Sequence, residues 1–350
     1  MSITIRPFGQ TADGRPVSLY TMTNASGASA AVCDLGARLV SVFVPDRNGK
    51  LEDVCIGFDD ASVYETKVGA SVGATIGRVA NRIGGSSFEL NGKTYTLPAN
   101  DGPNCLHGGP KGFHTYMWQA DCHEGAQADY VSFRLESKDG DAGFPGNMQI
   151  ETIFAWTEEN ELCISYHAIS DQDTLCNLTN HAYFNMDACG NALDHTMQIN
   201  ADLITVTDDA LIPTGEELDV TGLSADLRKP VTLRDGMSRG ADFPLIIKKN
   251  GYDFNYRLQG DGFRSAAILR GAVSGRKLHV CTTEPCIQLY TGQHFNVEGH
   301  NGCHYGAWAG VALETQHHPD AIHHANFPSV VLPAGKAFSS QTVFSFSVEA

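Results

Sequence analysis

The sequence predicts an all-β protein, and three features of the chain support this prediction. Apolar and polar residues alternate over many short segments, which is typical of half-buried strands. The 350 residues include 36 glycines, which suits frequent turns between such strands. The chain shows no internal repeat, low-complexity tract or Pro/Ser-rich linker, so we expect residues 1–350 to form a single β-rich domain.

The N-terminal part is expected to consist of short strands joined by turns. Residues 17–22 and 40–44 alternate, and the second segment runs into a turn at residues 45–49. Residues 51–58 are expected to return as another strand. A short helix is expected around Tyr64.

The next segment, residues 73–85, is rich in glycine. It lacks the Gly-Lys-Ser/Thr ending of a phosphate loop and the spacing of a dinucleotide site. Asn81 and Arg82, at its end, supply forked donors suited to sugar hydroxyls or a carboxylate. A structural ion pair is the alternative interpretation for Arg82.

A β-hairpin is predicted after this segment, because Asn91-Gly92 stands between alternating residues. His107 then follows on a loop flanked by glycines. Glycine permits close approach of the backbone to a ligand, but a loop histidine of this kind can equally be structural.

Strands are expected at residues 130–135, 147–156 and 161–169. Residues 179–185 differ, because they place amide, imidazole and phenol groups, among them His181, in a segment otherwise patterned like a strand. Alternating polar side chains of such a segment can point into one cleft. The alternative is a histidine whose hydrogen bonds are satisfied within the core.

The C-terminal third continues with strands, interrupted by a long polar connection at residues 214–240. Asp253 stands beside aromatic residues, and Gln288 lies in a strand-like segment. Further strands are expected at residues 266–269, 277–281, 287–292, 308–313, 330–333 and 342–348.

Glu314 directly follows the apolar segment 308–313. A buried strand there would deliver its carboxylate from a rigid element to the mouth of a pocket. A carboxylate acts as a general base only if an acid faces it, and His181 is the candidate acid. We therefore expect Glu314 and His181 on opposite sides of one small polar molecule.

Charge and composition exclude several partners. The net charge is −16, and no basic stripe is present to hold phosphates, so neither nucleic acid nor an anionic membrane surface is expected as a partner. No segment resembles a signal peptide or is long enough to cross a membrane. The ten cysteines form no CxxC pair or framework spacing, so we expect reduced thiols and a cytoplasmic location.

Six motifs in order along the chain resemble those of the aldose 1-epimerase (galactose mutarotase) family, from about Phe8 to Phe346. They are Gly77-Arg78-Val79-Ala80-Asn81-Arg82-Ile83, Leu106-His107-Gly108-Gly109, Asn180-His181 with Tyr183-Phe184-Asn185, Gly251-Tyr252-Asp253, Gln288-Leu289-Tyr290-Thr291-Gly292, and Glu314-Thr315-Gln316 with Pro319-Asp320.

The resemblance implies a large antiparallel β-sandwich of the galactose mutarotase type, crossed by a sugar cleft. It implies an isomerase that interconverts the α and β anomers of free aldohexoses such as galactose and glucose. By position, Glu314 matches the family's general base and His181 its general acid. The positions that match sugar-binding residues are Asn81, Arg82, His107, Asp253 and Gln288.

Two departures from the family pattern accompany this match. Phe254 follows Asp253 where family members often carry histidine, which puts the surroundings of the Asp253 carboxylate in question. His323 and His324 fill a turn that is usually rich in amides.

The implied reaction fits these residue types. Mutarotation removes a proton from the anomeric hydroxyl while another proton reaches the ring oxygen, and reclosure after bond rotation reverses both transfers. This requires one base and one acid, with no metal, nucleophile or cofactor. Ordinary pKa values of about 4.3 for Glu and 6.5 for His allow an ionised pair near neutral pH.

Three other functions are alternatives. A hexose-6-phosphate 1-epimerase of the same fold would need cations at the rim of the site, and Arg82, Arg78 and Lys111 are the candidates. A glycoside hydrolase usually carries two carboxylates, which does not suit Glu314 facing a histidine. A non-catalytic sugar-binding module would have a broken acid–base pair, whereas both members are present.

A metal site is conceivable at the four histidines spaced HH-x4-HH after Glu314. They are His317, His318, His323 and His324. We favour the alternative that these are surface loop histidines beside the catalytic strand, and we expect no metal.

Overall fold

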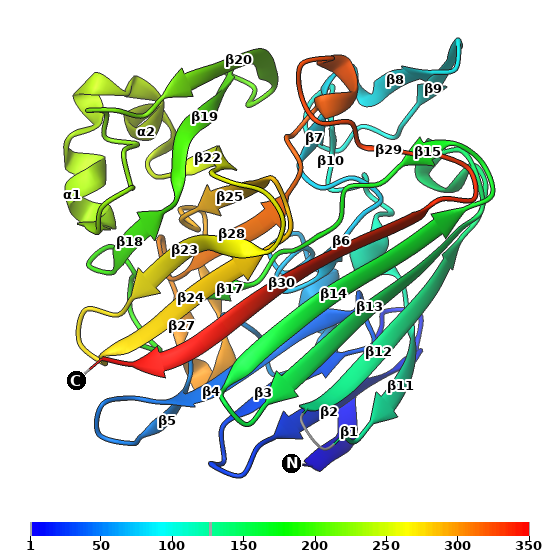
Figure 1. The fold of residues 1–350 in the computed structure, drawn as a ribbon. Helices are drawn as coiled ribbons and strands as arrows, with labels where there is room; N and C mark the ends of the chain where they lie inside the picture. Colours follow the sequence, from blue (N-terminus) through cyan, green and yellow to red (C-terminus); the bar gives the residue numbers. More distant parts are fainter. Residues whose placement is uncertain (1, 126–127, 350) are drawn as a thin grey trace.

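Three antiparallel sheets make up most of the computed structural model, which describes residues 2–125 and 128–349 (Figure 1). The largest sheet has nine strands, which cross the front of the view in Figure 1. In spatial order they are β11 (Gln119–His123), β12 (Ala128–Ser137), β13 (Met148–Thr157), β14 (Glu161–Ser170), β30 (Ala337–Val348), β24 (Arg276–Thr282), β23 (Arg264–Arg270), β18 (Thr196–Ile199) and β21 (Val231–Thr232).

A six-stranded sheet carries three of the seven predicted site residues, Asp253, Gln288 and Glu314. Its order is β17 (Tyr183–Phe184), β28 (Val311–Gln316), β25 (Cys286–Tyr290), β22 (Asp253–Leu258), β19 (Ala201–Thr207) and β20 (Pro213–Asp219). The N-terminal strands form a five-stranded sheet in sequence order: β1 (Ser2–Gln10), β2 (Pro16–Thr23), β3 (Ser29–Cys33), β4 (Arg38–Pro45) and β5 (Leu51–Asp53).

Short two-stranded pairs connect these sheets. They are β6 (Thr75–Ile76) with β16 (Thr179–Asn180), β7 (Arg82–Ile83) with β10 (Cys105–Leu106), β8 (Ser87–Leu90) with β9 (Lys93–Thr96), β15 (Thr174–Leu175) with β29 (Val331–Leu332), and β26 (Val297–Glu298) with β27 (His304–Tyr305). The described α-helices are α1 (Leu233–Ser238) and α2 (Pro244–Lys249). Short 3₁₀ turns occur at Ala61–Glu65, Gly84–Ser86, Phe113–Thr115, Asp141–Gly143, Gly240–Asp242, His300–Gly302 and Ala321–His323.

The sheets pack around a shared apolar core. One buried cluster contains Val42 of the five-stranded sheet, Phe154 of the nine-stranded sheet and Leu313 of the six-stranded sheet. The rings of Phe184 on β17 and Phe344 on β30 lie 5.2 Å apart, so these two sheets face each other. Burying one such side chain contributes about 1.5–3 kcal/mol. The predicted β-sandwich is therefore confirmed, and the assignment of residues 1–350 to one domain stays a prediction.

Alternation along β28 separates the core from the polar face of the six-stranded sheet. Leu313 packs into the core, and the Thr315 hydroxyl lies 2.6 Å from that of Thr342 on β30. Glu314 lies between them in sequence, so its side chain leaves the opposite face of the sheet. Packing of the apolar positions thus fixes the direction in which the carboxylate points.

Several predicted elements agree with the structure. The Asn91-Gly92 hairpin is confirmed as β8 and β9, with φ of 54° and 75° at the two turn residues. These positive angles are the ones that a two-residue hairpin turn requires, and Asn-Gly adopts them readily. The predicted alternation of the strand at residues 161–169 is also confirmed, because buried and less buried residues alternate along β14.

Other predictions were wrong. The strand expected over residues 51–58 ends at Asp53. The polar connection at 214–240 contains most of β20 and all of α1, whose N-cap Thr232 accepts a hydrogen bond from the Asp235 amide. The buried strand expected at residues 308–313 begins at Val311 and continues to Gln316. Glu314 therefore lies inside this strand rather than after its end.

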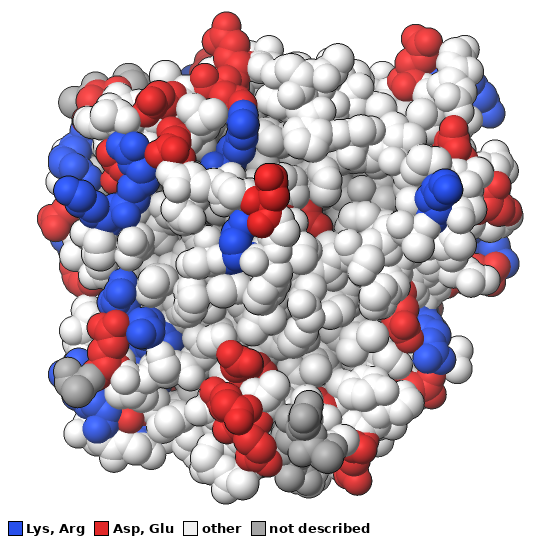
Figure 2. All heavy atoms as spheres, in the orientation of Figure 1, with Lys and Arg blue, Asp and Glu red and all other residues white. Residues whose placement is uncertain are grey.

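Charges on the surface show both signs close together. Acidic and basic side chains are interspersed over the face shown in Figure 2. Within the described ranges, no helix is long and apolar enough to cross a membrane.

Arg78 is buried rather than a cation at a rim. Its guanidinium donates to the carbonyls of Pro145, Gly146, Ser137 and Lys138 at 2.7–3.0 Å, and only 2% of the residue is exposed. Arg78 is therefore wrong as a candidate for a cation that binds a sugar phosphate at the rim of the site. Its hydrogen bonds instead hold the glycine-rich segment that leads to Asn81 and Arg82 against the 137–146 connection.

We expect Arg78→Met to lower the free energy of unfolding by roughly 3 kcal/mol or more, because several buried carbonyls lose their donors. Arg134→Met is the matched control. Arg134 makes two surface ion pairs and its side chain is 53% exposed, so it should cost less than about 1 kcal/mol. Urea denaturation of both variants measures the difference. Equal losses would mean that the Arg78 network contributes no special stability.

Candidate active site

The strand register brings His181 and Glu314 together. Tyr183 on β17 pairs with Ala312 on β28 in an antiparallel ladder. Continuing this register by two residues sets His181 opposite Glu314. His181 Nε2 lies 3.6 Å from Glu314 Oε1, and both residues are buried. The structure thus places a carboxylate and an imidazole side by side, deeper than the pocket mouth that the sequence suggested.

A row of polar residues continues across the sheet from this pair. Glu314 pairs with Gln288 on β25, and Gln288 pairs with Asn255 on β22. The Asn255 side-chain amide donates to the Thr205 hydroxyl on β19 at 2.9 Å. All four residues are buried. Polar groups in the middle of a sheet lose contact with water, and their burial is costly unless they are hydrogen-bonded. A row of four such residues therefore indicates a functional position.

Asp253 adjoins this row. Gln288 Nε2 donates to Asp253 Oδ1 at 2.7 Å, which sets the orientation of both side chains. A small cavity opens here, and four of the predicted binding residues line it. Its lining consists of Asn81, Arg82, Thr205, Thr207, Leu211, Asp253, Asn255, Gln288 and Pro319.

The β7–β10 pair brings the remaining predicted residues to the site. The Asn81 amide donates to His107 Nδ1 at 3.2 Å, and the His107 amide donates to the Asn81 carbonyl at 2.9 Å. With Nδ1 accepting, the neutral His107 ring carries its proton on Nε2. The His107 and His181 rings lie 5.0 Å apart. All seven predicted site residues therefore meet in one region of the fold.

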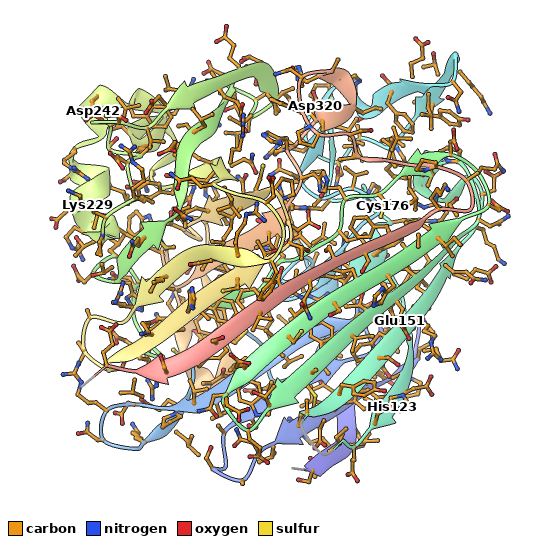
Figure 3. All side chains as sticks on the ribbon, viewed as in Figure 1. His123, Glu151, Cys176, Lys229, Asp242 and Asp320 are labelled. Carbon is orange, nitrogen blue, oxygen red and sulfur yellow. The ribbon has the colours of Figure 1, made fainter. Side chains whose placement is uncertain are left out.

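Arg82 forms an ion pair beside the site and also lines the cavity itself. Its Nε donates to Asp101 Oδ2 at 2.7 Å, so the ion pair weighed as an alternative is present. Its guanidinium also lines the cavity and acts electrostatically on Asp253 and Glu314. Asp320 is labelled in Figure 3 and follows β28; its carboxylate accepts from the Gly84 amide at 2.9 Å, and its backbone amide donates to the Arg82 carbonyl at 3.0 Å. These bonds fix the β7 segment beside the site.

Several buried polar atoms at this site have no hydrogen-bond partner within the described part of the chain. They are His181 Nδ1, Glu314 Oε2, Gln288 Oε1 and Asn255 Oδ1. Buried polar atoms are nearly always paired in folded proteins, and exceptions mark functional positions. A molecule with several hydroxyl groups would supply the missing partners.

Burial shifts the pKa of both members of the pair toward their neutral forms. Desolvation, assisted by the negative charge of Asp253, raises the pKa of Glu314 well above its ordinary value. Desolvation lowers the pKa of His181 to about 4. The pKa of His107 is also lowered, by burial first and by His181 second. Burial thus opposes the ionised Glu314–His181 pair expected from ordinary pKa values.

These shifts favour the neutral state of the pair over the ionised state. An ionised pair and a neutral pair hold the same single proton, on the imidazole in one state and on the carboxyl in the other. In water the ionised state is favoured by the difference between the ordinary pKa values. Burial offsets that preference.

Three further residues lie at this site that the sequence did not identify as site residues, although the Tyr183 phenol belongs to the polar segment noted at 179–185. Tyr183 stacks on His181, with ring centroids 4.9 Å apart and an interplanar angle of 29°. Asn255 and Thr205 extend the polar row. Tyr183 and Asn255 stand two residues after His181 and Asp253 respectively, so the period of a strand could have found them. Thr205 carries no such signal.

Phe254 does not disturb the Asp253 carboxylate. It is buried in the apolar core, where its ring centroid lies 5.0 Å from that of Phe243 and 6.3 Å from that of Tyr252. Asp253 leaves the opposite face of β22 because successive side chains alternate. The question raised by this departure from the family pattern is thereby answered.

The four C-terminal histidines do not converge on one point. His317 contacts Glu284, and His318 contacts Glu217, at 2.8 and 3.1 Å. His323 contacts Asp320 at 2.6 Å, and His324 lies 3.1 Å from the Pro213 carbonyl. The surface-loop interpretation is wrong for His318, which is 2% exposed.

One group in the described ranges has the spacing of metal ligands, and it belongs to the candidate active site. The ligand atoms of His107, His181 and Glu314 lie within 4.8 Å of one another. The prediction that no metal takes part stays a prediction.

Comparisons with known proteins point in one direction. A family profile described as aldose 1-epimerase matches residues 18–345. The chain is 37% identical to human galactose mutarotase, with 99% of each chain covered. It is 35% identical to the aldose 1-epimerase of Escherichia coli, with 96% of this chain and 97% of that protein covered.

Solved structures agree. A Caenorhabditis elegans GalM/aldose epimerase homologue superposes with a TM-score of 0.86 at 32% identity, covering 94% of this chain and 98% of the other. A galactose 1-epimerase from Lactobacillus acidophilus superposes with a TM-score of 0.88 at 27% identity, covering both chains fully.

The burial of Glu314 predicts a dependence of stability on pH. A carboxyl whose pKa is raised by folding holds its proton more tightly in the folded state. Glu314 therefore destabilises the folded protein as the pH rises above about 4.5, the unfolded value, until the pH passes the folded pKa. Glu314→Gln removes this penalty, so it should raise Tm relative to the native protein, and by more at pH 8 than at pH 5.

Thermal unfolding at both pH values tests this expectation. Glu89→Gln is the control, because Glu89 is exposed on β8. It should shift Tm little at either pH. A Glu314→Gln variant that melts below the native protein, with a deficit that grows as pH rises, would show that the ionised carboxylate stabilises the fold.

Proposed function

Since the chain belongs to the aldose 1-epimerase family, we propose that it interconverts the α and β anomers of free aldohexoses such as galactose and glucose, with Glu314 as general base and His181 as general acid. The observation that carries this proposal is the buried pair itself. A carboxylate and an imidazole 3.6 Å apart can reach two oxygens bonded to the same carbon. In a pyranose these are the anomeric hydroxyl and the ring oxygen, both on C1.

Ring opening begins from the ionised form of the pair, which burial opposes and which the positive charge of Arg82 favours by lowering the pKa of Glu314. Glu314 accepts the proton of the anomeric hydroxyl, and the electron pair left on that oxygen forms the carbonyl. The bond between C1 and the ring oxygen breaks, and His181 donates a proton to the departing oxygen. The products are an open-chain aldehyde, a neutral carboxyl and a neutral imidazole, which is the state that burial of the pair favours.

Reclosure reverses these transfers after rotation about the bond between C1 and C2. His181 takes the proton from the C5 hydroxyl, whose oxygen attacks the other face of the carbonyl. Glu314 returns its proton to the oxygen on C1. The site ends with the proton distribution it had at the start, so no cofactor is consumed. Each contact of this kind typically accelerates a reaction by about 10²–10⁴.

The neighbouring residues supply the hydrogen bonds that hold the ring. Asp253 is positioned by Gln288 to accept from sugar hydroxyls, and Arg82 and Asn81 line the same cavity. His107 offers its Nε2 proton, since Nδ1 is bound to the Asn81 amide. Holding the ring in one orientation keeps both proton transfers within reach.

A free sugar suits this site better than a sugar phosphate. Of the three cations considered for a phosphate, Arg78 is buried among backbone carbonyls, and Arg82 is already paired with Asp101. Asp253 and Glu314 add carboxyl groups to the same cavity region, which disfavours a dianion. Polarimetry on fresh α-D-galactose and α-D-glucose, beside an assay with glucose 6-phosphate, distinguishes the two substrate classes.

Glu314→Gln and His181→Asn should each lower kcat by roughly 10²-fold or more, because either change blocks one of two linked proton transfers. The dissociation constant for galactose should change far less, since the hydroxyl-binding residues remain. The double variant should not show the product of the two losses, because the transfers serve one step. Asp253→Ala, by contrast, should weaken binding as well as turnover.

Polarimetry gives kcat, and calorimetry gives the dissociation constant. Glu151→Gln and His123→Asn are controls of the same chemistry on β13 and β11 of the nine-stranded sheet, both labelled in Figure 3, and both should keep full turnover. Near-native turnover of Glu314→Gln would show that the assignment of the base is wrong.

A further inference from the structure

Two cysteines outside the candidate active site lie in contact. Cys189 Sγ and Cys303 Sγ are 3.0 Å apart, although the residues are separated by 114 positions in the chain. Cys189 is exposed and Cys303 is half-buried, whereas five of the other cysteines are buried. This pair therefore combines proximity with access to reagents in solution.

The backbone on both sides holds the two sulfurs in place. Asn185 donates through its side-chain amide to the carbonyls of Cys189, Gly190 and Ala309, at 3.4, 3.2 and 2.8 Å. One side chain thus ties the Cys189 loop to the segment that leads into β28. The Cys189 loop is thereby fixed to the segment that lies six residues after Cys303 in the chain.

Backbone hydrogen bonds also hold the turn that contains Cys303. The Cys303 amide donates to the His300 carbonyl at 2.9 Å, and the Gly299 amide donates to the Cys303 carbonyl at 2.8 Å. The His300 ring contacts Asp53 Oδ2 and the Phe58 carbonyl, at 2.8 and 2.9 Å. Forming a bond between the sulfurs then needs only small changes of side-chain torsion, with the backbone near its present course.

The two thiols differ in reactivity. Burial, and the hydrogen bond with Cys189, raise the pKa of Cys303 to about 11, so Cys303 keeps its proton near neutral pH. The thiolate is the nucleophile in thiol–disulfide exchange, and access governs its rate. Cys189 is the more exposed sulfur, which makes it the first to react.

We propose that Cys189 and Cys303 form a reversible oxidation site, which a small disulfide such as oxidised glutathione converts to an intramolecular disulfide. The Cys189 thiolate attacks one glutathione sulfur and expels the first glutathione thiolate. Cys303 then loses its proton and attacks Cys189 Sγ, which expels the second. Two protein thiols become one disulfide, and one glutathione disulfide becomes two glutathione thiols, so atoms and electrons balance.

The disulfide would join the segment after β17 to the turn before β27, and so link the two parts of the chain that supply His181 and Glu314. Cys189 follows β17, the strand next to His181, and Cys303 precedes β27 and β28, the latter carrying Glu314. Cross-linking residues this far apart removes much conformational freedom from the unfolded chain. The native strands are already paired, so oxidation should stabilise the fold and leave turnover within about twofold of the reduced enzyme.

The test starts from fully reduced protein incubated with oxidised glutathione. Thiols titrated after denaturation should fall from the ten of the reduced chain to eight, and peptide mapping should find Cys189 linked to Cys303. Tm should rise by about 5 °C or more. Dithiothreitol should restore both the thiol count and the original Tm.

Three variants complete the experiment. Cys122→Ser removes another exposed cysteine and should still form the bond. Cys189→Ser and Cys303→Ser should show no rise in Tm, and each should retain activity when reduced, which verifies folding. The proposal is overturned if the native protein keeps ten thiols, if it carries glutathione on Cys189 without the cross-link, or if Cys189→Ser gains the same stability.

Discussion

The structure depends on one constraint, the position of β28 between two neighbours. On one side its register sets Glu314 opposite His181, and on the other side it sets Glu314 opposite Gln288. A shift of one residue would turn the Glu314 side chain into the apolar core and bring Leu313 to the polar face. The packing of Leu313 and Thr315 against the nine-stranded sheet resists such a shift. Core packing and proton chemistry are thus linked through one strand.

The same constraint explains how the fold tolerates a buried acid and a buried imidazole. Each would be costly alone, and both pKa shifts record that cost. The backbone around His181 is firmly held: the Gly73 amide donates to the His181 carbonyl, and the His181 amide donates to the Ala74 carbonyl. Arg38 supports this loop by donating to the carbonyls of Gly69, Ala70 and Val72. Stability elsewhere offsets a locally unfavourable pair.

Part of this could be predicted from the sequence. Alternation and turn residues identified most strands because they report local geometry, as the Asn91-Gly92 hairpin shows. The family motifs pointed to the seven predicted site residues, which the fold then gathers from distant parts of the chain. The exact end of the Glu314 strand was missed, because pairing with β25 carries β28 on to Gln316, and no turn residue near Glu314 records that pairing.

The failures have a common physical cause. Arg78 and His318 look like surface residues by type, and only their long-range partners, backbone carbonyls for one and Glu217 for the other, allow them to be buried. Asn180 and Asn185 share a motif with His181, yet both amides bind backbone carbonyls instead of facing the site. The contact of Cys189 with Cys303 is likewise a product of tertiary structure, since irregular spacing gives no sign of it.

The central claim is that Glu314 and His181 address the two oxygens on C1 of one sugar. A crystal structure of the Glu314→Gln variant with galactose tests this most directly. The account predicts the anomeric oxygen within about 3.2 Å of the side chain at position 314 and the ring oxygen within about 3.2 Å of His181 Nε2. A sugar whose C1 points toward Asp253 or Arg82, with neither oxygen in reach of the pair, would contradict it.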